Sequence, residues 1–174
     1  DGIYVFRGSA GSKPLIGDAV SVDGTVLEFR PGGNANNLTT TEISATGAAG
    51  TCTRLSSGNA LPTAVVIRNG FVPPSAIAPN VGNVETSGHV LQPGTYGMDF
   101  YESLEGMRVS LPSAVAVAPR NSFGEVAVVA GSQIGAAGTI TAPRGGVVIG
   151  AGQFNGQRIQ LDDRLVATPV VNSG

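Results

Sequence analysis

Residues 100–111, FYESLEGMRVSL, gather aromatic, acidic and apolar side chains in a chain otherwise rich in small residues. In the second half of this stretch apolar and polar residues alternate, which is the period of a half-buried strand. Pro112 follows, and the strand should end there because proline cannot donate to a sheet ladder. We expect Arg108 to face outward. The predicted core residues of this strand are Met107, Val109 and Leu111.

The first half of the stretch, residues 100–106, indicates a turn or a short helix. Glu102 and Glu105 lie three residues apart, as neighbours on one helical face do, and Gly106 permits a sharp change of direction. Two carboxylates could form an acid/base pair. We favour a structural role for both, because no second catalytic group lies in register with them.

Short runs of alternating or continuous apolar residues recur along the whole chain and predict an all-β fold. One of them, residues 17–29, contains Asp23-Gly24, which could be a hairpin turn or a bulge in one bent strand. We favour the bent strand. The predicted strands cover roughly residues 1–7, 17–29, 38–45, 51–55, 64–68, 107–111, 114–119, 124–131, 146–152 and 158–163.

A length of 174 residues fits one domain, and we predict a single domain over residues 1–174. Residues 69–97 lose all periodicity and contain four prolines, so we expect a long irregular insertion there. Loops of this length usually carry function or a partner contact. Residues 165–174 should form a tail, either a free strand or a linker.

The charge content limits the classes of partner. Only 13% of residues are charged, against about 25% in an average soluble domain, and the net charge is −2. This composition argues against a dedicated duplex-DNA binder, although a local arginine patch is compatible with it. No apolar run approaches 18 residues, so we expect no membrane span.

Seven stretches of the chain resemble a known family, the OB-fold-like modules that precede the endonuclease/exonuclease/phosphatase catalytic domain in large secreted bacterial nucleases. The most specific is DFYESLEGM, residues 99–107. The matching stretches are DGIYVF (1–6), GDAVSVDGTVLEF (17–29), LTTTEI (38–43), LPTAVVI (61–67), DFYESLEGMRVSL (99–111), FGEVAVV (123–129) and RIQLDD (158–163).

The resemblance implies an OB-like barrel that lacks its first strand and carries extra strands. It also implies a secreted protein, extracellular or at the cell surface, whose catalytic nuclease domain lies elsewhere in a longer parent chain. The missing strand would leave two open sheet edges, which favour pairing with another chain. Strand donation between copies, from the tail at residues 165–171, is then a structural hypothesis.

Candidate nucleic-acid residues follow from the same resemblance, because OB barrels stack bases on aromatic side chains and hold phosphates with arginine. These candidates are Tyr4, Arg7, Phe29 and Arg30. The alternative, which we favour, places Tyr4, Phe6 and Phe29 in the core.

Metal and cofactor chemistry has little support in the sequence. Asp162 and Asp163, with Asp18, could contribute to a Ca²⁺ site, since this ion prefers clustered oxygens. We favour a polar strand end, and we expect no cofactor. His89, the single histidine, stands in a glycine-rich loop and could be a metal ligand, but we favour a solvated loop residue because no second histidine or cysteine accompanies it.

The sequence therefore predicts a non-catalytic module that acts by nucleic-acid binding or by scaffolding a nuclease domain. The alternative is a structural subunit that assembles into an extracellular filament or tube through its sheet edges.

Overall fold

The computed structural model describes residues 2–9, 13–35, 37–47, 50–68, 70–136, 139, 141–151, 154–163 and 167–172. The chain divides into two compact units. Unit 1 comprises Asp1–Ala64 and Leu104–Arg108, and unit 2 comprises Val65–Ser103 and Val109–Gly174. A single domain over residues 1–174 stays a prediction, because this division describes contacts and not cooperative unfolding.

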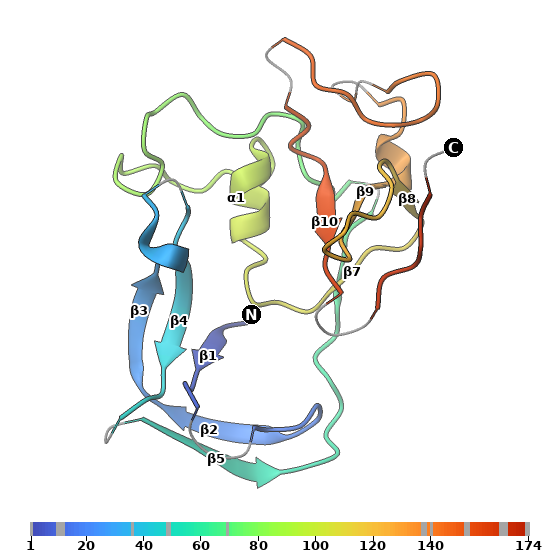
Figure 1. Ribbon diagram of the computed structural model, residues 1–174. Helices are drawn as coiled ribbons and strands as arrows, with labels where there is room; N and C mark the ends of the chain where they lie inside the picture. Colours follow the sequence, from blue (N-terminus) through green and yellow to red (C-terminus); the bar gives the residue numbers. More distant parts are fainter. Residues whose placement is uncertain are drawn as a thin grey trace. The chain divides into compact units, whose positions relative to one another are not determined.

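Short strands account for most of the regular structure, which is all-β with one short helix (Figure 1). The helix is α1, Gly97–Glu102, and two 3-10 turns lie at Pro31–Gly33 and Gly131–Gln133. The strands are β1 Tyr4–Phe6, β2 Ala19–Asp23, β3 Thr25–Phe29, β4 Thr40–Ser44, β5 Thr51–Ser56, β6 Val65–Val66, β7 Val109–Ser110, β8 Ala114–Ala116, β9 Val126–Ala130 and β10 Ile159–Leu161.

Unit 1 contains two small sheets, ordered β1-β4-β3 and β2-β5. β1 runs parallel to β4, whereas β3 and β4 are antiparallel. β2 and β3 follow one another in different directions and pair with different partners, so Asp23-Gly24 bends one long strand and makes no hairpin (Figure 1). The predicted bend is confirmed. A Cβ on Gly24 would lie 2.5 Å from Ser44 O, which explains why glycine occupies this position.

The core of unit 1 is thin. Among its described residues only Glu42 and Ala45 are buried, and neither is a large apolar side chain. Large apolar side chains instead remain exposed on β1, β3 and the flanking loops. Unit 1 therefore has apolar surface that it does not cover with its own described residues.

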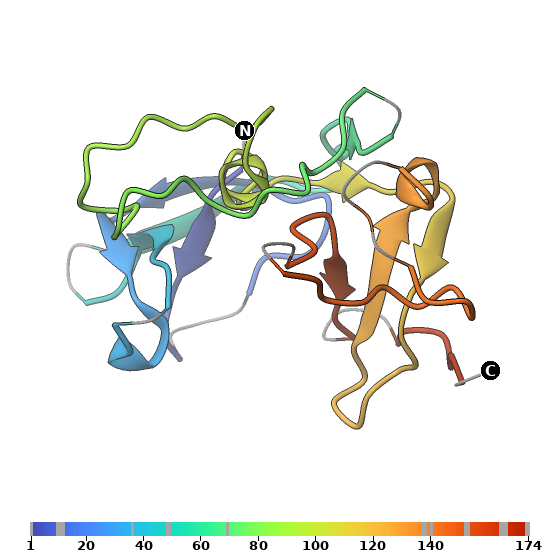
Figure 2. The same ribbon diagram turned by 90° about the horizontal axis from the view of Figure 1, so that it is seen from above.

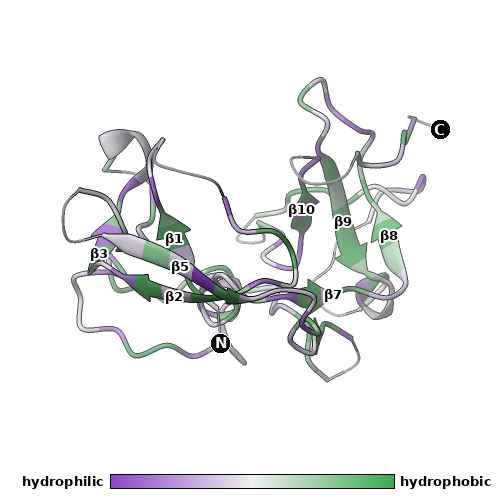
Figure 3. Ribbon diagram, turned by 90° about the horizontal axis from the view of Figure 1, so that it is seen from below, coloured by the Kyte–Doolittle hydropathy of each residue, from purple (hydrophilic) through white to green (hydrophobic). Residues whose placement is uncertain are grey.

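Unit 2 has a conventional core built on the sheet β10-β9-β8, whose strands lie side by side in antiparallel order (Figure 2). Central β9 is apolar along its length (Figure 3), and Val126, Val128 and Val129 are buried. Phe100 of α1 is 1% exposed and lies against Phe71, with ring centroids 4.9 Å apart. Burial of these side chains stabilises unit 2 by the hydrophobic effect.

The strand predicted at residues 107–111 is shorter than expected. β7 covers Val109–Ser110 and pairs only with the two residues of β6. Val109 is 44% exposed, so its predicted burial is wrong, because a two-stranded sheet of this size has too little surface to cover it. Met107 and Leu111 are half-buried, while Arg108 is exposed as expected.

The remaining expectations concern the barrel, the strand at residues 146–152, the irregular insertion and the absence of a membrane span. The described strands form four small sheets and close no barrel. No strand forms at residues 146–151, where Val147 and Gly150 make isolated bridges, that of Val147 with Thr141. Residues 70–96 carry no strand or helix, in line with an irregular insertion. Within the described part of the chain, no helix is long and apolar enough to cross a membrane.

The predicted tail is bound to its own unit over part of its length. The Arg120 amide donates to Val171 O at 2.9 Å, and Arg120 Nε donates to the Thr168 hydroxyl at the same distance. Donation of this segment to another copy would break both bonds. Residues 165, 166, 173 and 174 of the predicted tail, and residue 69 of the predicted insertion, lie outside the described residues.

Candidate nucleic-acid interface

An aromatic groove runs along one face of the β1-β4-β3 sheet in unit 1. Tyr4 and Phe6 lie two apart on β1, and Leu27 and Phe29 two apart on β3, so the pleat directs each pair to one face. The groove has a volume of about 550 Å³. Its lining residues are Tyr4, Phe6, Leu27, Phe29, Pro31, Thr40, Glu42 and Ser44.

The aromatic rings of this groove face solvent. Tyr4 is 55% exposed, Phe29 48% and Phe6 44%. The favoured prediction, that these three aromatics fill the core, is therefore wrong. The physical reason is the small size of the sheet: three strands with five or fewer residues each offer one face, and no described element of unit 1 buries the rings.

A second groove adjoins the first at β1. It has a volume of about 370 Å³, shares Tyr4 and Phe6 with the aromatic groove, and adds Arg7 and Lys13. A third groove shares Lys13 and Cys52 with the second and adds Arg54. Shared lining residues thus connect aromatic and basic side chains along one unit.

Arg30, the fourth sequence candidate, does not line these grooves. Its guanidinium donates to the Asn37 carbonyl and so helps to close the loop after β3. The structure therefore brings Tyr4, Phe29 and Arg7 together and leaves Arg30 in a loop-closing role. The sequence does not single out Lys13, Arg54 or Glu42 as binding residues, whereas the strict alternation in DGIYVF places Tyr4 and Phe6 on one face.

Glu42 supplies the one carboxylate among the residues that line the aromatic groove. It lies opposite Tyr4 on one side and Leu27 on the other, at the centre of the three-stranded sheet. It is 4% exposed, and no hydrogen bond or ion pair to its carboxylate is found among the described residues. Glu105, by contrast, accepts from the Thr41 amide at 3.1 Å, which supports the structural role expected for it.

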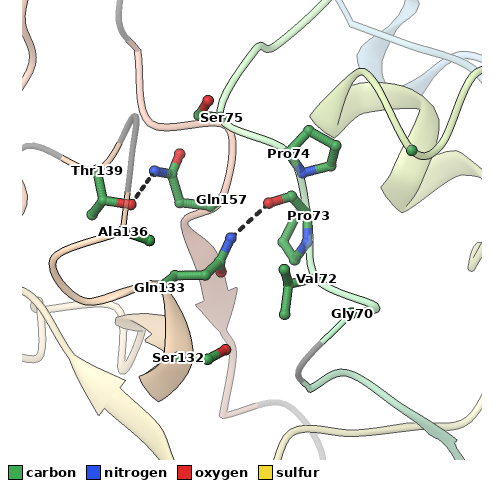
Figure 4. Close-up of a pocket in the computed structure, with 11 residues that line it drawn as sticks. Gly70, Val72, Pro73, Pro74, Ser75, Ser132, Gln133, Ala136, Thr139 and Gln157 are labelled. Atoms are coloured by element: carbon green, nitrogen blue, oxygen red, sulfur yellow. Dashed lines mark hydrogen bonds between the residues drawn. The ribbon is translucent and has the colours of Figure 1, made fainter.

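Unit 2 contains a separate polar pocket of about 460 Å³ between the residue 70–75 segment and the turn after β9 (Figure 4). Gln133 Nε2 donates to Pro73 O at 2.7 Å, and Gln157 Nε2 donates to the Thr139 hydroxyl at 2.6 Å. No charged or aromatic side chain lines this pocket. Its amides hold the Pro73 segment and Thr139 in place within unit 2.

His89 is not the solvated loop residue that the sequence predicts. Its Nε2 atom lies 2.7 Å from Asp99 Oδ2, and the two side chains are 6% and 4% exposed. Asp99 also accepts from the Gln92 amide at 2.8 Å. The pair fastens the irregular segment before α1 to the helix itself.

The acidic candidates for calcium are occupied by other partners. Asp163 pairs with Arg120 at 3.0 Å, and Asp18 accepts from the Leu15 amide at 2.9 Å. Asp18 belongs to unit 1, whereas Asp162 and Asp163 belong to unit 2. Among the described residues no group of three or more potential metal ligands occurs.

Comparison with protein families gives one match. A family model described as a domain of unknown function, DUF8508, matches residues 55–174, which is more than two thirds of the chain. The chain belongs to this family. No curated protein and no solved structure matches it.

The DUF8508 match begins in β5 and includes all of unit 2. The polar pocket and the His89–Asp99 pair lie inside the matched segment. The aromatic groove, at residues 4–44, precedes it. The comparisons name neither an OB fold nor a nuclease, so that resemblance stays a prediction.

Proposed function

We propose that this chain is a non-catalytic binding module whose unit 1 binds single-stranded nucleic acid along the aromatic groove and its basic continuation. The observation that carries the proposal is the exposure of Tyr4, Phe6 and Phe29 on one sheet face. Bases stack on exposed aromatic rings whatever their sequence, and each stacked base contributes about 1–3 kcal/mol.

Basic side chains beside the groove supply the second part of such a site. Arg7, Lys13 and Arg54 line the adjoining grooves and can contact phosphates while the bases lie on the rings. A single strand suits this arrangement better than a duplex, because a duplex keeps its base faces stacked inside. The net charge of −2 also disfavours tight duplex binding.

The resemblance to modules of secreted nucleases extends the proposal. In that setting the chain would be an accessory, OB-like part of an extracellular protein that presents single strands to a catalytic domain. No catalytic role is proposed for any residue of this chain.

The proposal is tested by titrating the chain into a fluorescein-labelled eight-nucleotide single strand and measuring anisotropy at several salt concentrations. Each phosphate contact to a single strand contributes about −0.7 to the slope of log K against log salt concentration, so three contacts predict a slope of about −2. Lack of binding at low salt would refute the proposal, and binding with a slope near zero would exclude the basic residues from it.

A second candidate function is self-assembly into a filament or tube. The observation in its favour is that β1 and β3, the outer strands of their sheet, each pair on one side only among the described residues. Open edges of this kind accept strands from another copy. Light scattering at tens of micromolar tests it: a monomeric mass would exclude assembly.

A further inference from the structure

Glu42, a residue only 4% exposed, carries the one carboxylate of a groove otherwise lined by aromatic, aliphatic and hydroxyl side chains. Its neighbours in register are Tyr4 on β1 and Leu27 on β3, so its side chain leaves the sheet on the same face as theirs. A ligand that lies on the aromatic rings therefore meets this carboxylate at the centre of the groove.

A ligand that covers this carboxylate takes it out of water, which is unfavourable unless the ligand supplies donors. The described residues give Glu42 no such donor, although it is 4% exposed. Thr40 and Ser44 line the same groove, but neither hydroxyl bonds the Glu42 carboxylate. A ligand that brings its own N–H donors would supply what the groove lacks, and would gain specificity from doing so.

The four bases differ in the donors that their Watson–Crick edges present. Guanine offers two adjacent donors, N1–H and the 2-amino group, which match the two oxygens of one carboxylate. Cytosine and adenine each offer one amino group beside an acceptor. Thymine and uracil offer one N–H between two carbonyl oxygens, which a carboxylate repels.

We propose that Glu42 reads the Watson–Crick edge of a guanine stacked in the aromatic groove, so that unit 1 prefers single strands that contain guanine. The proposal rests on the proposed function, since it needs a base in the groove. Single-stranded bases are commonly read on this edge while they stack on aromatic side chains.

A lysine or arginine side chain of a protein partner could also approach a carboxylate among aromatic rings. Two features favour a base. Arg7 and Lys13 line the adjoining groove and would repel a cationic partner, whereas they attract a phosphate chain. The three rings also come from two strands on either side of β4, which spreads them as a platform.

The test compares labelled eight-nucleotide thymidine strands that carry one central guanine, hypoxanthine, adenine, cytosine or thymine. A single guanine avoids the quadruplexes that guanine runs form. We expect the guanine strand to bind about tenfold more tightly than the all-thymine strand, a typical effect of one bidentate base contact. Hypoxanthine, which lacks the 2-amino group, should lie between them.

The Glu42→Gln variant keeps the side-chain volume and removes one acceptor. It should lower the guanine preference to below about threefold while the all-thymine strand binds as well as before or better. Glu28→Gln is the matched control, because Glu28 is on the same sheet, bonds Thr41 and does not line the groove. It should retain the full preference.

The outcomes separate the two proposals. If no strand binds, the proposed function fails and this inference with it. If all strands bind equally, or if Glu42→Gln keeps the guanine preference, only the reading by Glu42 is refuted. Binding of an oligo-arginine peptide that is abolished by Glu42→Gln, without binding of any strand, would assign the groove to a cationic protein partner and overturn both.

Discussion

His89 Nε2 and Asp99 Oδ2 lie 2.7 Å apart between a segment without regular structure and the first turn of α1. The Asp99 carboxylate also holds the Gln92 amide, so one buried group organises both the segment and the helix. His89 additionally lies edge-on to Tyr96, with ring centroids 6.1 Å apart.

Removing Asp99 should destabilise unit 2. Asp99→Ala leaves a buried imidazole and the Gln92 amide without their acceptor, and we expect a loss of about 3 kcal/mol in the free energy of unfolding. A double-mutant cycle with His89→Ala, measured by urea unfolding, isolates the pair and should give a coupling of about 1–2 kcal/mol. Strictly additive effects would show that the pair does not act as a unit.

The buried hydroxyl of Tyr101 should make the protein less stable at alkaline pH. Its hydroxyl donates to the carbonyls of Gly156 and Arg158 at 3.1 and 3.2 Å. Burial raises the pKa of this hydroxyl well above its ordinary value of 10, and the nearby Arg158 charge offsets only part of the effect. Because the folded pKa is the higher one, the contribution of Tyr101 is fully present below pH 10 and is lost as the pH rises from there toward the folded pKa.

Urea unfolding between pH 8 and pH 11.5 measures this loss. The free energy of unfolding should fall by up to about 1.4 kcal/mol per pH unit. Tyr101→Phe should cost about 1 kcal/mol at pH 8 and remove this part of the alkaline slope. An identical slope in Tyr101→Phe would contradict the assignment.

Gly24 is expected to tolerate no side chain. A Cβ there would lie 2.5 Å from Ser44 O and 2.7 Å from Ile43 Cγ2, so Gly24→Ala must displace β4 from the bend between β2 and β3. We expect a loss of roughly 2 kcal/mol or more in thermal or urea unfolding. Gly94→Ala, at a glycine with open space around it, is the control and should change stability by less than about 1 kcal/mol. Equal effects at both positions would refute this reading of the bend.

The sequence predicts the local structure of this chain better than its burial. Alternating residues indicated most strands, and Asp23-Gly24 indicated the bend, because both depend on neighbours along the chain. Burial at Val109 and Tyr4 depends on how many strands join each sheet. The periodicity of the sequence gives no information on that number. The same limit explains why the prediction of a solvated His89 is wrong. Its contact with Asp99 depends on how an irregular segment folds, and the sequence pattern does not predict that.

The candidate site was foreseen in part. Tyr4, Phe29 and Arg7 came from the resemblance to OB-fold-like modules, and the structure places all three along connected grooves. Glu42 could not be foreseen, because a glutamate within a threonine-rich strand is typical of an exposed face. Only the pairing of β4 between β1 and β3 puts it at the centre of the groove.

The central claim is that bases stack on the aromatic face of unit 1. It is tested most directly by anisotropy titration of a labelled eight-nucleotide single strand with the Tyr4→Ala and Phe29→Ala variants. Val26→Ala is the control, because Val26 is 63% exposed on β3 but does not line the groove. The account predicts that each aromatic variant weakens binding at least fivefold, the effect of losing about 1 kcal/mol or more of stacking, while Val26→Ala binds as the unaltered chain does. Unchanged affinity in both aromatic variants, with the strand still bound, would contradict it.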